Sequence, residues 1–453
     1  MKKYRIKKQY RTPVRLSCLG CFGTIMLVVF AICRCSCGGC SGKDDAVKAE
    51  QRIVHLNDTL TNALVDVPEL HDMDSIMRRY LKRWELNGAQ LAVTRNDSLL
   101  YVKGYGWADK ERNVLMEPCH IMRMASVSKL VTAVGIMKLQ EMGRLKLSDK
   151  VFGPQGILND TTYINSIRDK RYYDITVEQL LRHKAGFNNY AGDPMSSTRY
   201  IMMQNRLTTP PTHRELLRIL LRRHLGYTPG TGRCYSNLGY TILSMIIEKR
   251  SGMSYEQFMQ DKVLRPAGCF DFHIAGIYYR DRRPNEVRYY MHGGSEPVYE
   301  YNNSGKKVDK CYGDTDIPRL AGAGAWAASA AELSRLIASI DGCSVLPDVI
   351  SPQSVKAMTQ QMPSGDYSLG WNYTPVGRPW IRTGSLSGTS ALVMRYPDGQ
   401  CWILLTNTST WKGHGFSIDT ISLFEKLRKK YMKLMPKRNL FGVLDEKQSL
   451  VSR

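Results

Sequence analysis

The sequence predicts a mixed α/β (α+β) protein in which a central antiparallel sheet is flanked by helices and carries a helical subdomain. Two observations lead to this fold class. Strand-like runs separated by turn residues lie near both ends of the chain, and helical patterns fill the residues between them. The composition, 43% hydrophobic and 23% charged over 453 residues, is that of a globular protein and excludes a disordered or collagen-like chain.

The elements near the two ends are predicted from apolar spacing and turn chemistry. They are a helix over residues 68–86, a hairpin of strands 91–94 and 99–102, a second hairpin of strands 391–396 and 401–407, and a basic amphipathic helix over 419–432. Since the two hairpins come from opposite ends of the chain, we expect them to share one sheet.

The middle of the chain is predicted to be mainly helical. Capping boxes at Thr176 and Ser329, each with Gln or Glu three residues later, mark two helix starts. The helical runs are 126–142, 177–183, 240–250, 255–263 and 330–340. Two polar stretches without periodicity, 153–174 and 276–318, are predicted to be loops.

The net charge of +23 is concentrated at the two ends of the chain. Residues 1–43 hold nine Lys and Arg without an acid, and residues 421–453 carry a net charge of +6. Only +8 therefore remains for the residues between them, which argues against a nucleic-acid-binding face in the fold.

An uncharged run over residues 16–33 follows seven basic residues. Its eighteen residues are just long enough to span a bilayer as a helix, and the basic flank is expected to stay in the cytoplasm. We therefore expect a membrane-attached domain outside the cytoplasm, in the bacterial periplasm or at the cell surface. Three fates of the segment stay open: an uncleaved anchor, a lipoprotein signal with acylation at Cys40, or a cleaved signal peptide.

The cysteine pattern suggests a metal site that we reject. Cys18 and Cys21, then Cys37 and Cys40, have zinc-ribbon spacing, but the residues between the two pairs are the membrane segment. We therefore predict no metal and no cofactor. The remaining cysteines are dispersed, and we expect small buried side chains rather than disulfides.

Ser126 and Lys129 form the first candidate catalytic motif. Ser–x–x–Lys places the hydroxyl at a helix N-terminus and the amine on the same helix face, where a partly buried lysine can serve as a base. The same spacing occurs at Ser304 and at Ser409, but only Ser126 opens an apolar helical run. Context therefore selects Ser126.

Tyr235-Ser236-Asn237 is the second motif, at a turn leading into a helix. A phenol near a lysine ammonium can have its pKa lowered enough to relay protons. The amide of Asn237 can both donate and accept hydrogen bonds, which suits a substrate amide.

The third motif, Arg382-Thr383-Gly384-Ser385, leads into a strand. A cation and a hydroxyl on an edge strand can bind a carboxylate, and the glycine lets a substrate approach the backbone.

Together and in this order, the three motifs resemble the serine β-lactamase and penicillin-binding protein superfamily. The closer likeness is to its branch of class C β-lactamases, D-Ala-D-Ala carboxypeptidases and esterases, whose pattern is Ser–x–x–Lys, Tyr–x–Asn and Lys/His–x–Gly. Residues 180–186 and 321–324 match further stretches typical of this branch, and the likeness extends over about residues 74–430. The resemblance implies a β-lactamase/DD-peptidase-like fold.

The resemblance also implies a role for each matching residue. Ser126 would be acylated, Lys129 and Tyr235 would share the proton transfers, and Asn237 would hold the substrate amide. The backbone N–H groups of Ser126 and Ser385 would form the oxyanion hole. His183 and His120 are predicted to be structural.

Arg382 departs from the family pattern, which has Lys or His there. Thr383, Gly384 and Ser385 are predicted to bind substrate with it. Because arginine keeps its charge, carboxylate recognition would survive, whereas proton transfer at this position and efficient β-lactam turnover are in doubt.

These features predict a monomeric serine hydrolase acting on a small-molecule or peptide substrate, such as a peptidoglycan-derived one, with no nucleic-acid partner. The alternatives are a non-catalytic wall-binding module and a true class C-type β-lactamase. The predicted organisation is a basic N-terminus with anchor or signal over 1–42, a tether and helix start over 43–73, the hydrolase domain over 74–432 and a basic tail over 433–453.

Overall fold

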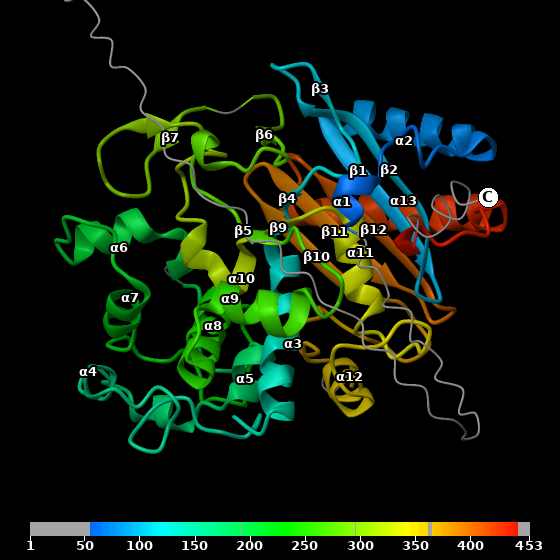
Figure 1. Ribbon diagram of the computed structural model, residues 1–453. Helices are drawn as coiled ribbons and strands as arrows, with labels where there is room; N and C mark the ends of the chain where they lie inside the picture. The colour runs from blue at the N-terminus through cyan, green and yellow to red at the C-terminus, as the bar shows by residue number, and fades with distance from the viewer. Residues whose placement is uncertain (1–54, 191, 295, 361–364, 443–453) are drawn as a thin grey trace, which may run out of the picture. The chain divides into compact units, whose positions relative to one another are not determined.

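A six-stranded antiparallel sheet in the order β10-β11-β12-β1-β2-β3 lies at the centre of the fold (Figure 1). Its strands are β1 (Gly88–Arg95), β2 (Ser98–Asp109), β3 (Val114–Leu115), β10 (Trp380–Leu386), β11 (Thr389–Arg395) and β12 (Gln400–Thr406). Strands from the two ends of the chain meet where β1 pairs with β12, Ala89 opposite Thr406 and Arg95 opposite Gln400. The prediction of one antiparallel sheet built from both ends is confirmed.

The computed structural model describes residues 55–190, 192–294, 296–360 and 365–442, which belong to one compact unit. The predicted membrane segment 16–33 and Cys40 lie outside these residues. Within the described ranges, no helix combines the length and the apolar character needed to cross a membrane.

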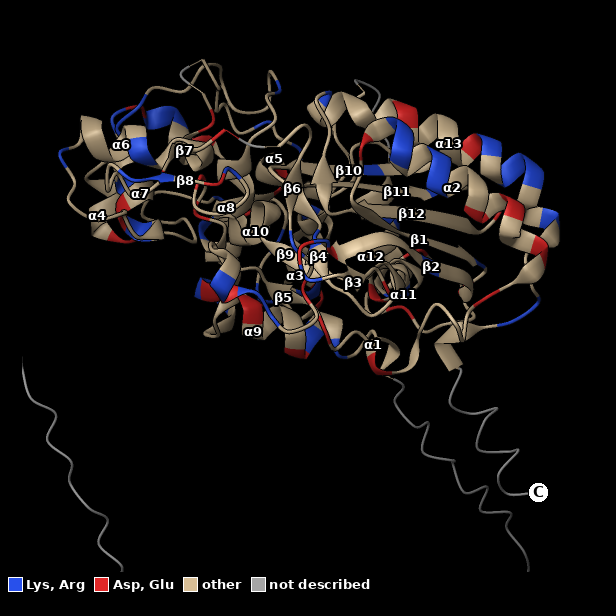
Figure 2. Cartoon of the chain, turned by 90° about the horizontal axis from the view of Figure 1, so that it is seen from above, with Lys and Arg blue, Asp and Glu red and all other residues tan. Residues whose placement is uncertain are grey.

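Helices α2 (His71–Trp84) and α13 (Phe416–Tyr431) run side by side over one face of the sheet (Figure 2). Both were predicted, with ends that differ by a few residues. Between them and the sheet lies a core in which Trp402 packs on Phe424, with ring centroids 5.9 Å apart.

The opposite face is covered by α11 (Ala330–Ala338), which contacts β1, β2 and β12, whereas α3 (Ser128–Glu141) packs on α8 (Asn237–Ser251) and α10 (Ala321–Gly324) (Figure 2). All but three of the fourteen residues of α3 are buried, which places this helix between the sheet and the helical part of the molecule. Gly322, in α10 (Ala321–Gly324), allows a close approach, because a Cβ there would lie 2.4 Å from the carbonyl oxygen of Tyr240.

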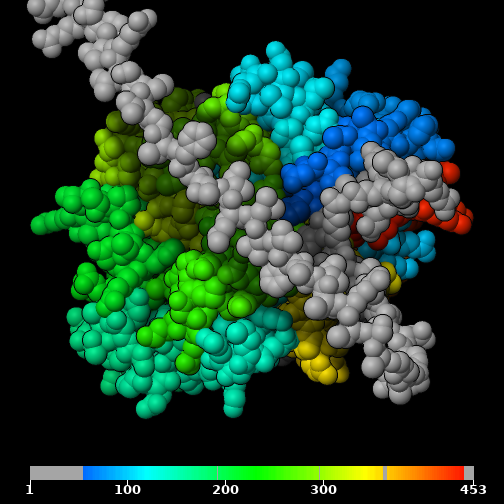
Figure 3. All heavy atoms as spheres, viewed as in Figure 1, coloured from blue at the N-terminus to red at the C-terminus, as the bar shows by residue number. Residues whose placement is uncertain are grey.

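Most of the remaining helices gather beside the sheet, and the green residues around 150–250 form one side of the molecule in Figure 3. These helices are α4 (Thr161–Ile164), α5 (Val177–Leu181), α6 (Thr198–Gln204), α7 (His213–Leu220), α8 (Asn237–Ser251) and α9 (Tyr255–Met259), with α12 (Pro352–Thr359) after α11. The predicted helical subdomain corresponds to this region.

Short strands tie the connecting segments together. β4 (Met122–Arg123) and β5 (His273–Ile274) flank β9 (Trp326–Ala328), β6 (Tyr290–Met291) pairs with β13 (Thr408–Ser409), and β7 (Val298–Tyr299) pairs with β8 (Lys307–Val308). The stretch 276–318, predicted to be a loop, therefore contains three of these strands.

The chain before α2 packs against the domain, whereas the sequence predicted a polar tether there. Helix α1 (Leu56–Thr59) contacts α11, and Leu56 and Leu60 are buried in the core. The apolar side chains at these two positions account for the difference.

The six described cysteines are all free thiols. Cys269, Cys311 and Cys401 are buried, as expected of small apolar side chains, and the other three are half-buried.

Candidate active site

Ser126 lies in a single 3₁₀ turn, Ala125–Val127, that leads directly into α3. The preceding residue, Ala125, has φ of +48°, a left-handed conformation that a residue with a Cβ rarely adopts. Ser126 itself is half-buried while its neighbours on both sides are buried. This turn presents one hydroxyl from an otherwise buried segment.

Lys129 lies in the first turn of α3, with its ammonium fully buried. Its Nζ lies 3.2 Å from Ser126 Oγ, 2.6 Å from Asn237 Oδ1 and 2.7 Å from the carbonyl oxygen of Ala323. Burial lowers the pKa of Lys129, and the nearby Arg382 cation lowers it further, against the opposing effect of Tyr235. The 321–324 stretch that matched the family pattern thus supplies a carbonyl ligand to the amine.

Tyr235 lies between two cations. Arg382 Nη2 donates a hydrogen bond to Tyr235 Oη at 3.2 Å, and Lys129 Nζ lies 4.7 Å from the ring centroid. Burial alone would raise the pKa of Tyr235, but the charges of Lys129 and Arg382 outweigh it and lower this pKa to about 8. The phenol can therefore release its proton near neutral pH.

Asn237 begins α8, and Ser236 caps this helix through a hydrogen bond from the Gly239 N–H. Its Oδ1 accepts from Lys129, and its Nδ2 donates to the carboxylate of Asp193. The two contacts fix which way the amide points, so Asp193 orients Asn237.

Strand β10 passes close to the serine turn. A Cβ at Gly384 would lie 2.3 Å from the carbonyl oxygen of Met124 and 3.2 Å from the backbone nitrogen of Ser126, so only glycine fits there. On the same strand, the Thr383 N–H donates to Asn372 Oδ1 at 2.8 Å.

A cavity of about 480 Å³ opens between these elements. Six of the eight predicted site residues line it: Ser126, Tyr235, Asn237, Thr383, Gly384 and Ser385. Tyr367 adds to the wall near Tyr235 and Asn372 near Thr383, and Phe416 and Thr420 of α13 form another part. The structure therefore brings the three motifs to one cavity.

Arg382 takes a different place from the one we predicted. Its side chain is 1% exposed, and its Nε and Nη2 both donate to the carbonyl oxygen of Ser126, at 2.7 and 2.5 Å. Because strand side chains alternate between the two faces of a sheet, Arg382 points away from the face that carries Thr383 and Ser385. The guanidinium supports the serine turn from behind and is not part of the cavity wall.

The two histidines near the motifs have structural contacts, in line with the prediction. His183 Nδ1 accepts from the Ser236 N–H at 3.1 Å, and its ring lies 4.4 Å from that of Tyr235. Burial and the nearby cations hold the pKa of His183 well below its usual range, so the ring stays neutral. His120 Nδ1 accepts from the Glu117 N–H.

Sequence reasoning missed Asp193, Asn372 and Tyr367. Asp193 precedes Pro194 at the start of a 3₁₀ turn, so its sequence context indicates only a cap. Asn372 and Tyr367 lie in segments without a regular pattern. Spacing along the chain carries no signal for any of the three.

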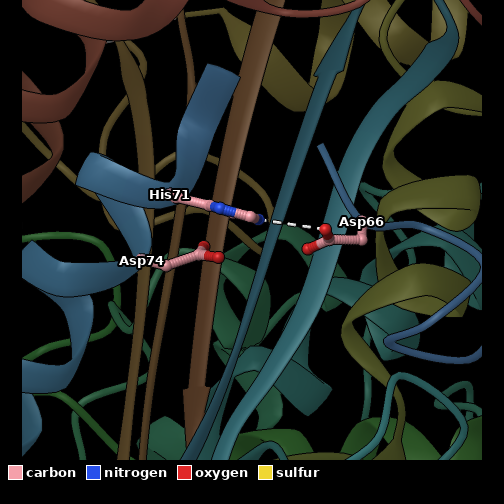
Figure 4. Close-up of side chains that lie close together, drawn as sticks. All are labelled: Asp66, His71 and Asp74. Carbon is pink, nitrogen blue, oxygen red and sulfur yellow. Dashed lines mark hydrogen bonds and ion pairs between the residues drawn. The ribbon is translucent and has the colours of Figure 1, made fainter. Parts of the chain in front are cut away.

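Asp66, His71 and Asp74 form a group of possible metal ligands outside the cavity (Figure 4). The ammonium of Lys103 lies 2.6 Å from Asp66 Oδ1 and 2.6 Å from Asp74 Oδ2. The Lys103 ammonium therefore already lies between the two carboxylates where a metal ion would bind, and the group does not fit a metal ion.

Comparison with known families decides the class of the protein. The sequence matches the Beta-lactamase family over residues 73–421. The chain belongs to this family. Its members are serine hydrolases that work by acyl transfer, and the protein is an enzyme of this class with the β-lactamase/DD-peptidase fold.

Individual relatives within and around the family are distant. A penicillin-binding protein of Bacillus subtilis (strain 168) is 26% identical over 331 residues, which cover 70% of this chain and 67% of that protein. Protein flp of Staphylococcus aureus (strain MW2) is 28% identical over 194 residues, 43% of this chain and 36% of that protein. The structure of D-amino acid amidase from Ochrobactrum anthropi SV3 with D-phenylalanine has a TM-score of 0.61 at 18% identity, over 80% of this chain and 99% of that one.

Proposed function

We propose that the protein hydrolyses a peptide, amide or ester through an acyl-enzyme on Ser126, in the manner of a D-Ala-D-Ala carboxypeptidase or esterase. The observation that carries the proposal is the position of Lys129 Nζ, 3.2 Å from Ser126 Oγ in a fully buried site. Its two shorter contacts go to carbonyl oxygens of Asn237 and Ala323, which only accept hydrogen bonds. In the neutral amine these two contacts use both N–H groups, and the lone pair is left for the serine proton.

The first half-reaction follows from this arrangement. Ser126 Oγ attacks the substrate carbonyl carbon while its proton passes to the Lys129–Tyr235 pair. The C–O bond to serine forms, the carbonyl oxygen becomes an oxyanion, and the bond to the leaving group then breaks. Tyr235 returns the proton to the leaving nitrogen or oxygen.

The second half-reaction repeats the sequence with water. The same pair takes a proton from water, the resulting hydroxide attacks the acyl carbon, and Ser126 Oγ leaves with the proton. The backbone N–H groups of Ser126 and Ser385 hold the oxyanion in both steps. Where one such donor has been removed from a hydrolase, rates fell by roughly 10²–10³.

The substrate class is proposed from the cavity and from the relatives. A volume of about 480 Å³ accommodates a small molecule or the end of a peptide. One structural neighbour is a D-amino acid amidase crystallised with D-phenylalanine, and one sequence relative is a penicillin-binding protein. D-amino-acid peptides, amides and esters, including fragments of peptidoglycan, are therefore the proposed substrates.

The experiment is an adduct measurement on the full chain with a fluorescent penicillin and, separately, a fluorophosphonate. We expect at least one probe to add its mass to the wild type and to Ser304→Ala, but not to Ser126→Ala. Ser304 is the matched control because it has the same Ser–x–x–Lys spacing in an exposed loop.

Four outcomes distinguish the remaining functions. Fluorophosphonate labelling alone supports an amidase or esterase, whereas labelling by both probes supports a penicillin-binding peptidase. Rapid release of the penicillin adduct would make the protein a class C-type β-lactamase. Absence of any adduct on folded protein would refute the catalytic proposal in favour of a wall-binding module.

We also propose that the domain is attached to the membrane outside the cytoplasm, through segment 16–33 or a lipid on Cys40. The basic flank before residue 16 supports this orientation. Protease added to intact cells should degrade the domain. Metabolic labelling with an alkyne fatty acid, compared between wild type and Cys40→Ser, separates the lipoprotein from the anchor.

A further inference from the structure

The turn between β1 and β2 packs against the loop 341–348 that follows α11. Asp97, in this turn, is 2% exposed, and its Oδ2 accepts from the Leu346 N–H at 2.9 Å. Asp97, Asp341 and Cys343 each place one possible ligand atom within 4.8 Å of the others. Asp348, at the end of the loop, accepts from the Gly342 N–H through its Oδ2 at 3.1 Å.

Two carboxylate oxygens at this place have no hydrogen-bond partner. Asp97 Oδ1 and Asp348 Oδ1 are both buried, and neither has a partner within hydrogen-bond distance among the described residues, although the weakly donating thiol of Cys343 lies against the Asp97 carboxylate. A buried carboxylate oxygen is normally hydrogen-bonded, because burying it unpaired costs free energy. One such atom in the β1–β2 turn and another in the loop that packs against it indicate a missing partner.

The charge of the group is compensated only in part. Asp97, Asp341 and Asp348 carry three negative charges, and within the described ranges Arg395 is the one cation in an ion pair with them, through Asp341 Oδ2 at 3.1 Å. The cluster around Asp66 provides the contrast, since there Lys103 lies between the carboxylates and satisfies them. No protein ammonium occupies the corresponding place at Asp97.

We propose that Asp97 and Asp341, with the charge of Asp348 close by, bind a calcium ion that ties the β1–β2 turn to the loop 341–348. The two unpartnered donors are carboxylate oxygens, which hard cations prefer, and loops of this kind add backbone carbonyls. If the Cys343 thiolate were a ligand, the site would favour zinc over calcium. Substitution of Cys343 therefore distinguishes the two metals.

The proposal predicts a calcium-dependent stability of the full chain. After removal of metals with a chelator, Ca²⁺ at about 10 mM, roughly 100 times a Kd of about 10⁻⁴ M, should raise the Tm by about 3 °C. Asp97→Asn keeps the shape and the acceptor for Leu346 but removes the charge, so the rise should disappear. Asp66→Asn, in the cluster that Lys103 neutralises, is the matched control and should keep the full rise.

The Tm of Asp97→Asn should also depend on Ca²⁺ in a way that loss of a structural hydrogen bond would not produce. With chelator present, Asp97→Asn should match or exceed the Tm of the wild type because it relieves repulsion between carboxylates, whereas with Ca²⁺ it should fall below it. Titration calorimetry should show one Ca²⁺ per chain in the wild type, and about tenfold weaker binding or none in the variant.

Three results would overturn the proposal. They are no rise of the Tm with Ca²⁺, an equal rise in Asp97→Asn, and a rise with Zn²⁺ alone that Cys343→Ser abolishes. The last would replace calcium by zinc as the metal.

Discussion

Replacing Arg382 by glutamine should move the pH dependence of acylation to higher pH. The guanidinium lies 3.2 Å from Tyr235 Oη and lowers the pKa of Tyr235 through its charge. It also lowers the pKa of Lys129, because two neighbouring cations repel each other. Removing the charge therefore raises both pKa values, whichever group accepts the serine proton.

The size of the shift follows from the distance. For unit charges 3.2 Å apart and an effective dielectric constant of about 40 to 80, beside a cavity open to water, the interaction is worth about 1.3–2.6 kcal/mol. This corresponds to about 1–2 pKa units. The base must lose its proton to act, so the rate rises with pH through the pKa. At neutral pH the variant should acylate about 10–100 times more slowly than the wild type.

The assay is the second-order rate of fluorophosphonate labelling of the full chain between about pH 6 and pH 10. Arg382→Lys retains a cation and serves as the control, with a midpoint close to that of the wild type. Glutamine keeps a donor for the Ser126 carbonyl, and near-UV circular dichroism checks that the site stays folded. A midpoint that stays unchanged or falls in Arg382→Gln would refute the electrostatic reasoning.

Three further substitutions test separate contacts. Gly384→Ala should slow acylation by about 10²-fold or more and lower the Tm, because its Cβ would lie 2.3 Å from a backbone carbonyl oxygen. A normal labelling rate would contradict the close approach of β10 to the serine turn. Asp193→Asn should slow labelling about tenfold at unchanged Tm because it frees the amide of Asn237, and an unaltered rate would deny Asp193 an orienting role. Lys103→Met should lower the free energy of unfolding by about 3 kcal/mol, because it leaves the buried charge of Asp74 without its cation. Urea denaturation measures this change. An unchanged denaturation midpoint would show that Asp74 tolerates the loss of Lys103.

The sheet could be predicted because its signals are local. In the turn between β1 and β2, Asn96 and Asp97 have φ of +46° and +59°, values that asparagine and aspartate tolerate well. Strand patterns at both ends of the chain predicted that the two hairpins share one sheet, and the structure shows that they meet where β1 pairs with β12. The register of that pairing depends on packing across the sheet, which no local pattern encodes.

Capping residues were predicted with mixed success. Thr176 and Gln179 form the expected reciprocal box. At Ser329 the hydroxyl caps α11, but the carboxylate of Glu332 accepts from the Phe270 and Asp271 N–H groups instead of returning to the cap. The spacing indicated that Glu332 would bind the backbone of its own helix start, but its carboxylate binds backbone groups from another part of the fold.

The contacts of the candidate site likewise include local ones, which the sequence could predict, and long-range ones, which it could not. Ser126 and Lys129 are three residues apart, and their contact could be predicted from this spacing together with the apolar helical run that Ser126 opens. The partners of Tyr235 and Asn237 come from segments more than forty residues away in the chain, so their contacts required the fold. The environment of Arg382 is the clearest case, because the sequence shows a cation on an edge strand but not the face on which it lies.

The position of Arg382 on that face of the strand affects the proposed mechanism. Arg382 holds the Ser126 carbonyl and lies against Tyr235 Oη, so its charge tunes the Lys129–Tyr235 pair, and an arginine is poorly suited to shuttle protons. Among the described residues that line the cavity there is no Lys or Arg, and hydroxyl, amide and aromatic groups predominate near Ser126. We infer that a substrate is held there by neutral donors and acceptors. These groups can donate hydrogen bonds to, and accept them from, the reacting amide or ester group of a substrate, which itself carries no charge.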